Sequence, residues 1–159
     1  GRISDRATAD YMGMLATVVN AWHCRILCFP IGCDAKVMTA IEIRDMAEGY
    51  SRRKALDYLD DNKVVIFGGG TGSPFFSTDT TAALRAAEMN AEVILLAKSI
   101  DAVYSEDPNV NPDAERYEEL NLYGYCREKK LRVMDSPLPL SVRTMTFSCT
   151  FLRWPKKET

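Results

Sequence analysis

The fold of this chain is decided by one stretch, which reads Val64-Val65-Ile66-Phe67-Gly68-Gly69-Gly70-Thr71-Gly72-Ser73-Pro74-Phe75-Phe76-Ser77-Thr78-Asp79-Thr80. Its first four residues are apolar and mostly β-branched or aromatic, which is typical of a short strand buried on both faces. Four glycines within the next five positions permit positive φ angles and a close approach of a ligand. Three N-cap residue types, Ser77, Thr78 and Asp79, then precede an Ala- and Leu-rich run. The order strand, glycine loop and helix start predicts an α/β fold with an anion site, usually for phosphate.

The glycine loop alone does not identify a ligand. It matches neither GxGxxG nor GxxxxGK[ST], since no Lys precedes Ser77 or Thr78. A glycine-rich turn also serves as a plain connection between a strand and a helix. Phe75 and Phe76 favour a binding site, because two adjacent rings in a polar loop offer an apolar wall to a flat base.

The string Gly70–Asp79 resembles the acceptor-nucleotide loop of bacterial-type UMP kinases, with Ser73 where an Asn is usual. Three further blocks are similar to the same family in the same order: Asp5–Thr17, Ala97–Pro108 and Val133–Ser136. The resemblance implies the α/β/α sandwich of the amino-acid-kinase fold. That sandwich is expected to be incomplete, since nothing here matches the family's N-terminal strands. We therefore expect residues 1–159 to form a single domain equivalent to the C-terminal portion of a UMP kinase.

The resemblance also implies roles for individual residues. Asp10 would bind the ribose of UMP, and a set of loop residues would hold the rest of the nucleotide: Thr71, Gly72, Ser73, Pro74, Phe75, Phe76, Ser77 and Thr78. Thr78 and Asp79 would be catalytic, Thr78 near the α-phosphate and Asp79 by organising Mg²⁺. Ser99, Tyr104 and Asp107 would contact ATP. No metal site formed by the protein alone is expected.

Each of these assignments has a purely structural alternative. Asp10 and Asp79 are also good helix N-caps. Tyr104 is also explained by packing, and Asp107-Pro108 by an Asp-Pro turn. For Asp10 the two interpretations are compatible, because a carboxylate at a loop-to-helix junction can face a ligand.

The implied reaction is ATP + UMP → ADP + UDP, a step of pyrimidine nucleotide biosynthesis. The family's Lys-x-Ser-Gly and Gly-Gly-Gly-Asn loops occur nowhere in the chain, and the Lys neutralises the transferred phosphoryl group. Removing one such electrostatic contact typically costs ~2.7–4 kcal/mol, so we expect weak activity or none. The alternatives are a non-catalytic UMP-binding or assembly module, and another amino-acid kinase acting on acetylglutamate or carbamate. The Pro-Phe-Phe-Ser-Thr-Asp string argues against the latter.

Composition sets broad limits on the class of protein. A net charge of −2 indicates no nucleic-acid surface, and no apolar run approaches the ~18 residues of a membrane span. Five cysteines without framework spacing suggest reduced thiols and a cytoplasmic setting. The start at Gly1 without Met or a leader favours a fragment. The family further implies a hexamer with GTP or UTP as effectors.

The rest of the chain gives a series of expected elements. Those elements are a helix over 8–22, a strand Ala35–Ile43, a helix Arg44–Tyr58, a helix Asp79–Asn90, a buried strand Glu92–Ala97, a loop Lys98–Asp113, a helix Tyr117–Lys130 and a strand Leu131–Met134. From Pro137 onward the match to the family fades. Phe147–Trp154 lacks the family's usual strand sequence, which leaves the closing strands in doubt.

His23, Cys24, Cys28 and Cys33 form the one cluster of metal-ligand types. Their spacing is too loose for CxxC pairs, and Pro30 and Gly32 would break a helix that could align them. We therefore interpret the Trp22–Ile31 segment, which departs from the family, as an apolar connection with incidental thiols.

Overall fold

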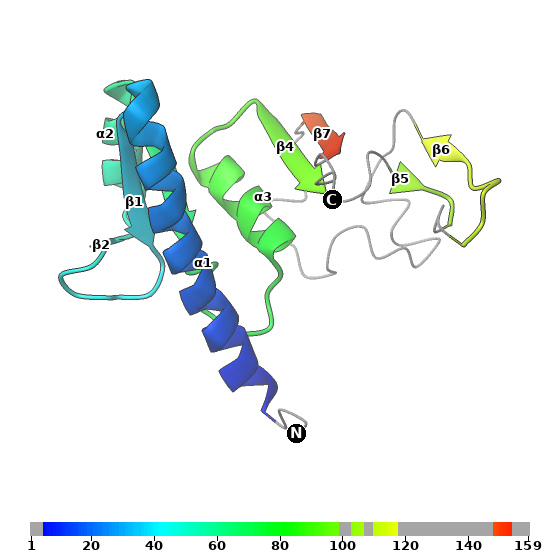
Figure 1. The fold of residues 1–159 in the computed structure, drawn as a ribbon, viewed down its shortest axis with the longest axis horizontal. Helices are drawn as coiled ribbons and strands as arrows, with labels where there is room; N and C mark the ends of the chain where they lie inside the picture. The colour runs from blue at the N-terminus through cyan, green and yellow to red at the C-terminus, as the bar shows by residue number, and fades with distance from the viewer. Residues whose placement is uncertain (1–4, 99–102, 107–109, 118–147, 154–159) are drawn as a thin grey trace. The chain divides into compact units, whose positions relative to one another are not determined.

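The computed structural model describes residues 5–98, 103–106, 110–117 and 148–153 (Figure 1). The chain divides into two compact units, Gly1–Thr81 and Ala82–Thr159, and each is described by itself. The single-domain organisation stays a prediction.

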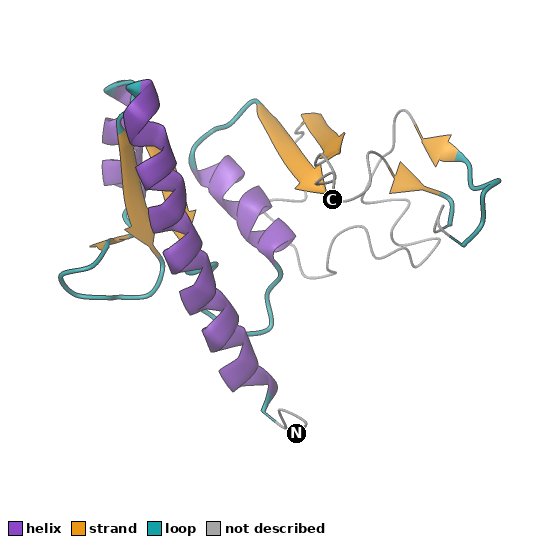
Figure 2. Ribbon diagram, in the orientation of Figure 1, coloured by secondary structure: helices purple, strands orange, loops and turns teal. Residues whose placement is uncertain are grey.

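The first unit is built on a parallel three-stranded sheet with the strand order β2-β1-β3. Its elements are α1 (Arg6–Cys28), the 3-10 turn η1 (Phe29–Ile31), β1 (Ala35–Thr39), β2 (Glu48–Gly49), α2 (Arg52–Asp60) and β3 (Val64–Gly68). In Figure 2, α1 lies in front of β1 and α2 lies behind it. The predicted α/β class and the helix–sheet–helix layering are therefore confirmed.

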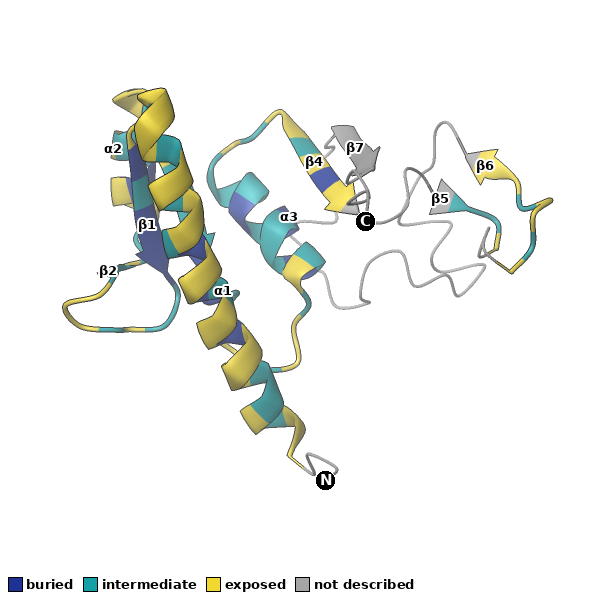
Figure 3. Ribbon diagram, in the orientation of Figure 1, coloured by how far each residue is buried: buried dark blue, intermediate teal, exposed yellow. Residues whose placement is uncertain are grey.

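The core of this unit lies on β1 rather than on β3 (Figure 3). Met38 is fully buried in β1, and Met14, Val18 and Ala21 of α1 are buried over the sheet. The sequence expectation that Val64–Phe67 is buried on both faces is wrong, since Val64 is 45% exposed. The reason is that β3 pairs with β1 alone among the described strands and so forms an edge of this sheet.

Helix α1 is longer at both ends than the predicted 8–22. Asp5 is its N-cap and accepts a hydrogen bond from the Ala7 amide at 3.0 Å. The Thr8 hydroxyl and backbone amides lower the pKa of the Asp5 carboxyl, as expected for a capping carboxylate. Asp10 therefore lies inside the helix, and the N-cap interpretation of Asp10 is wrong. The expected connection over Trp22–Ile31 is also wrong, because it is helical through Cys28 and η1 follows.

The expectation that no apolar run approaches the length of a membrane span is wrong, because by length and mean hydropathy the helical segment Arg6–Ile31 could cross a membrane. Its packing gives another reason for this composition. Met14, Val18 and Ala21 recur at helical spacing and form the stripe that α1 buries on the sheet.

The predicted helix Arg44–Tyr58 is correct only in its second half. Residues 43–47 form a turn with a bridge between Ile43 and Ala47, and Asp45 has a φ of 63°. Strand β2 then supplies a parallel partner for β1 before α2 begins at Arg52. The Glu48 carboxylate fixes β2 to α2 by accepting bonds from Lys54 Nζ at 2.6 Å and from Tyr58 Oη at 2.8 Å.

The described residues of the second unit form two pairs of strands. Helix α3 (Thr78–Glu88) begins at the end of the first unit, and the strands are β4 (Val93–Lys98), β5 (Val103–Tyr104), β6 (Arg116–Tyr117) and β7 (Ser148–Arg153). β4 pairs in parallel with β7, and β5 pairs antiparallel with β6. A strand therefore forms in Phe147–Trp154 although its sequence departs from the family, and β5 interrupts the predicted loop Lys98–Asp113.

Two other expectations for this unit have different outcomes. The predicted strand Glu92–Ala97 is confirmed within one residue, but its burial is uneven: Leu96 is buried, whereas Val93 and Leu95 are exposed. The helix expected over Tyr117–Lys130 and the strand Leu131–Met134 lie outside the described residues, apart from Tyr117, which is in β6.

Alanine substitutions at two glycines should change stability in opposite directions. Gly69 has a φ of 79°, and an added Cβ would lie 2.8 Å from Thr39 Oγ1, so Gly69→Ala should cost roughly 1–3 kcal/mol. Gly13 lies inside α1 with no atom within 4 Å of an added Cβ, so Gly13→Ala should gain roughly 0.5–1 kcal/mol. Urea unfolding of both variants measures the two shifts. Equal losses of stability in the two variants would contradict the positive φ and the close contact at Gly69.

The Glu48 cluster should make the first unit sensitive to acid. Bonds from Lys54 and then Tyr58 lower the pKa of the Glu48 carboxyl. A carboxyl with a lowered folded-state pKa stabilises the fold above its unfolded pKa of about 4.3. This stabilisation is lost as the pH falls through the folded value. In Glu48→Gln, the free energy of unfolding should therefore fall less steeply as the pH drops from about 5 to about 3. Lys54→Met should show part of the same effect. The same pH dependence of the unfolding free energy in Glu48→Gln and wild type would contradict this assignment.

Candidate functional site

The glycine loop joins the end of β3 at Gly68 to the start of α3 at Thr78. Three of its glycines, Gly69, Gly70 and Gly72, have φ angles of 79°, 61° and 80°. An added Cβ at Gly72 would lie 3.0 Å from the Ala40 carbonyl oxygen. Glycine is therefore required here both by the backbone conformation and by the close passage of the loop over the end of β1.

The backbone amides of the loop are divided between protein acceptors and open positions. Gly69 N–H donates to Thr17 Oγ1 at 2.8 Å, and Gly72 N–H donates to the Gly69 carbonyl at 3.0 Å. Ser73 N–H donates to Thr71 Oγ1 at 3.3 Å. Within the described residues, the adjacent amides of Gly70 and Thr71 have no hydrogen-bond acceptor. This turn therefore has two neighbouring donors for an anion. The amides of Phe76 and Ser77, just before α3, also have no acceptor among the described residues.

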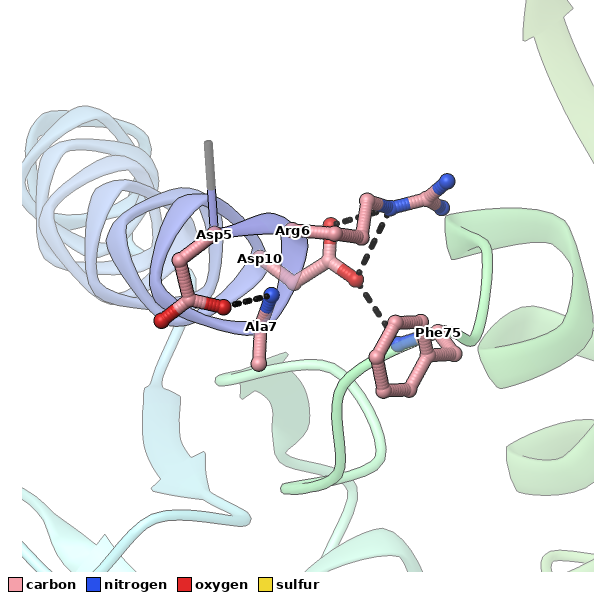
Figure 4. Close-up of polar contacts among 5 residues, drawn as sticks. All are labelled: Asp5, Arg6, Ala7, Asp10 and Phe75. Carbon is pink, nitrogen blue, oxygen red and sulfur yellow. Dashed lines mark hydrogen bonds and ion pairs between the residues drawn. The ribbon is translucent and has the colours of Figure 1, made fainter. Parts of the chain in front are cut away.

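Asp10 connects the first turns of α1 to this loop across 65 positions of sequence (Figure 4). Its Oδ2 accepts a hydrogen bond from the Phe75 amide at 2.7 Å. Arg6 Nε lies 3.2 Å and 3.3 Å from the two carboxylate oxygens, and its guanidinium lies over the Phe75 ring at 5.9 Å. The Asp10 side chain is 24% exposed, so a ligand can still reach it. The structure thus brings together the predicted ribose-binding carboxylate and the predicted nucleotide loop.

Phe75 is held in an unusual conformation at this contact. Its φ of 72° is in the left-handed region, which costs a non-glycine residue roughly 1–2 kcal/mol. A hydrogen bond to a charged group contributes about 1.5–3 kcal/mol, enough to offset this cost. The rings of Phe75 and Phe76 are both exposed, which leaves two apolar faces accessible beside the carboxylate.

Ser77 rather than Asp79 caps helix α3. The Thr80 amide donates to Ser77 Oγ at 3.2 Å, and Thr80 itself is buried. Thr78 and Asp79 lie in the first turn of the helix, where the helix dipole favours the Asp79 carboxylate. The structure therefore places Thr78 and Asp79 at the C-terminal end of the loop.

The predicted ATP residues are only partly described. Tyr104 is half-buried in β5 of the second unit, next to Arg116 of β6 in the ladder. Ser99 and Asp107 lie outside the described residues. Among the residues that the structure does describe, no group of three or more His, Cys, Asp or Glu side chains is arranged to hold a metal ion.

Sequence reasoning missed two residues that shape the site, Thr17 and Arg6. Thr17 Oγ1 accepts from the Gly69 amide and donates to the Met14 carbonyl at 2.6 Å, so one hydroxyl ties α1 to the loop. The available signal was helical spacing, since Arg6, Asp10 and Thr17 recur on one side of the helix.

The first unit also contains a cavity of about 210 Å³ that shares no residue with the glycine loop. It is lined by Trp22, Arg25, Lys36, Val37, Met46, Ala47 and Glu48. The Arg25 guanidinium lies 4.9 Å from the centroid of the Trp22 ring, and Arg25 Nε donates to the Ala35 carbonyl at 3.1 Å.

Comparison with known proteins agrees with this arrangement. The model of the amino acid kinase family matches residues 2–123. The chain belongs to the amino acid kinase family. Among solved structures it is similar to the UMP kinase from Bacillus anthracis, with 37% identity and a TM-score of 0.86 over 93% of this chain and 61% of that one. The UMP kinase from Ureaplasma parvum is 34% identical, with a TM-score of 0.78 over 87% and 57%.

A more distant match is the uridylate kinase from Archaeoglobus fulgidus, with 26% identity and a TM-score of 0.61 over 94% of this chain and 64% of that one. The chain thus spans less than two thirds of the length of each of these three kinases. The predicted resemblance to UMP kinases and the amino-acid-kinase fold are confirmed.

Removing the Thr17 hydroxyl should loosen the loop. Thr17→Val keeps the shape of the side chain but leaves the amide of the buried Gly69 without an acceptor, which should cost about 1–3 kcal/mol. Thr17→Ser keeps the hydroxyl and is the matched control, with a smaller loss expected. Urea unfolding compares the two variants. A Thr17→Ser protein as unstable as Thr17→Val would show that the methyl group, not the hydroxyl, matters.

Proposed function

We propose that this chain carries the acceptor side of a UMP kinase. UMP would bind at the glycine loop, which Asp10 holds by a hydrogen bond. The observation that supports the proposal is the Asp10–Phe75 hydrogen bond of 2.7 Å, because it joins two sequence blocks that match UMP kinases separately. Family membership supports a phosphotransferase of this kind. The reaction would be ATP + UMP → ADP + UDP.

The geometry suits a pyrimidine nucleoside monophosphate. A carboxylate offers about four lone-pair sites, so Asp10 can hold the Phe75 amide and Arg6 and still accept a bond from a ribose hydroxyl. The Thr71–Phe76 segment would supply backbone groups and exposed rings to the uracil. The open amides of Gly70 and Thr71 would donate to the phosphate, and Thr78 would lie near its α-phosphate region.

Catalysis would depend on positioning and on charge neutralisation. Asp79, at the start of α3, is a suitable ligand for the Mg²⁺ that accompanies ATP, and Mg²⁺ would neutralise charge on the phosphoryl oxygens. On the donor side, Ser99, Tyr104 and Asp107 stay predictions. The chain contains neither of the family's donor-phosphate loops, so we expect low turnover from these 159 residues.

A second candidate function is UMP binding or assembly without catalysis. It is favoured by the coverage of 57–64% of the related kinases together with the missing phosphate loops. A cytoplasmic location, a hexamer and regulation by GTP or UTP are further proposals that rest on the resemblance.

Calorimetry with UMP in the absence of ATP tests the acceptor site. We expect the wild-type chain to bind UMP in preference to AMP, and Asp10→Asn to weaken binding by roughly 10- to 100-fold, since a charged hydrogen bond is worth about 1.5–3 kcal/mol. Asp61→Asn is the matched control, because it neutralises an exposed carboxylate before the start of β3, at the opposite end of that strand from the loop. Equal affinity of wild type and Asp10→Asn, or no binding by wild type, would refute the proposal.

An ADP-release assay on the same protein separates the two candidate functions. Binding without turnover selects the non-catalytic module, whereas ordinary turnover on UMP would show that the donor loops are dispensable.

A further inference from the structure

The turn that ends α1 brings two cysteines together. Cys28 is the last residue of the helix, and Cys33 follows the 3-10 turn. The Cys33 amide donates to the Cys28 carbonyl at 3.1 Å, and the Gly32 amide donates to the Phe29 carbonyl at 3.1 Å. With Gly32 at a φ of 72°, these two bonds form a Schellman motif. In that motif the side chains at the positions of Cys28 and Cys33 commonly contact each other across the turn.

The interactions of the Cys28 side chain agree with this backbone geometry. Burial, a hydrogen bond with the Cys33 thiol and the charges of Cys33 and Cys24 all raise the pKa of Cys28. The Cys28 and Cys33 thiols therefore face each other, and the raised pKa of Cys28 makes it the weaker candidate for a reactive thiolate. Both residues are half-buried, so a small oxidant can reach them, while Cys24 is exposed one helical turn before Cys28.

We propose that Cys28 and Cys33 form a reversible redox pair that a hydroperoxide converts into a disulfide. The Cys33 thiolate attacks the peroxide oxygen, which gives a Cys33 sulfenic acid and releases an alcohol, or water when the oxidant is hydrogen peroxide. The Cys28 sulfur then attacks the Cys33 sulfur, and the sulfenic hydroxyl leaves as water with the Cys28 proton. Two thiols are oxidised, one peroxide is reduced, and a dithiol reductant restores the pair.

This site is independent of the proposed UMP site. Cys28 lies eighteen positions after Asp10 in α1, which corresponds to about 27 Å along a helix. The crosslink would close a short ring between the end of α1 and the residues before β1, without touching the glycine loop. The result of the disulfide experiment is therefore independent of the result of the UMP-binding experiment.

Peptide mapping of the full chain tests the pair directly. Trypsin cuts after Arg25 and Lys36, so one peptide, residues 26–36, contains Cys28 and Cys33 but not Cys24. After mild hydrogen peroxide treatment and alkylation, we expect this peptide to lose two hydrogens and to carry no alkyl group. Dithiothreitol should restore both alkylation sites. The Cys24→Ser variant is the matched control and should form the same crosslink.

Two further variants test the order of the steps. Cys28→Ser should accumulate a sulfenic acid at Cys33 that dimedone labels, and Cys33→Ser should label at least several-fold more slowly at Cys28. The proposal is overturned if peroxide leaves both thiols of the 26–36 peptide alkylatable. It is also overturned if the disulfide of the wild-type chain joins Cys24, Cys126 or Cys149 instead. Equal labelling of the two variants would overturn the assignment of Cys33 as the attacked thiol.

Discussion

The site depends on two hydrogen bonds that fasten the glycine loop to helix α1. The Gly69 amide donates to Thr17 at the start of the loop, and the Phe75 amide donates to Asp10 near its end. A loop with repeated positive φ angles has many alternative conformations, because glycine restricts the backbone so little. Two fixed points on one rigid helix select a single path between them. The shape of the loop is therefore set by α1 as much as by its own sequence.

Magnitudes decide which of the contacts around Asp10 matters. The Arg6–Asp10 pair is an exposed i,i+4 ion pair, a class worth about 0.3–0.5 kcal/mol. The amide–carboxylate bond belongs to a class worth about 1.5–3 kcal/mol, and it also offsets the strained φ of Phe75. Arg6 adds contact with the Phe75 ring, but the backbone bond holds the loop. A carboxylate that stabilises the loop and remains partly exposed can couple the binding of a sugar to the position of the neighbouring rings.

The sequence predicted the local order of this region well, because glycine positions and N-cap types report backbone conformation directly. Gly69, Gly70 and Gly72 all have the positive φ that such a loop requires. The expected burial of Val64–Phe67 failed, because burial depends on which strands pair on each side. An apolar run looks the same at the edge of a sheet and at its centre.

Strand pairing also explains two other segments whose structure the sequence did not predict. The first half of the predicted helix Arg44–Tyr58 became a turn and the strand β2, which pairs in parallel with β1. The Ser148–Arg153 segment became β7 by pairing with β4, although its sequence departs from the family. At Glu48–Gly49, pairing with β1 outweighed the predicted helix, and at Ser148–Arg153, pairing with β4 forms the strand that the sequence left in doubt. Single-sequence patterns contain no record of either partner.

The division of the chain into two units bears on the proposed chemistry. Asp10, the loop Thr71–Phe76 and the start of α3 all belong to the unit Gly1–Thr81, whereas Tyr104 belongs to the other. The proposed UMP contacts therefore need only one unit to be folded, and the hydrogen bonds that shape them lie entirely within it. Phosphoryl transfer would also require the donor side and the lysine that the chain lacks. If the proposed UMP contacts hold, binding and turnover should be separable in this protein, because those contacts lie in one unit and do not include the donor-side residues.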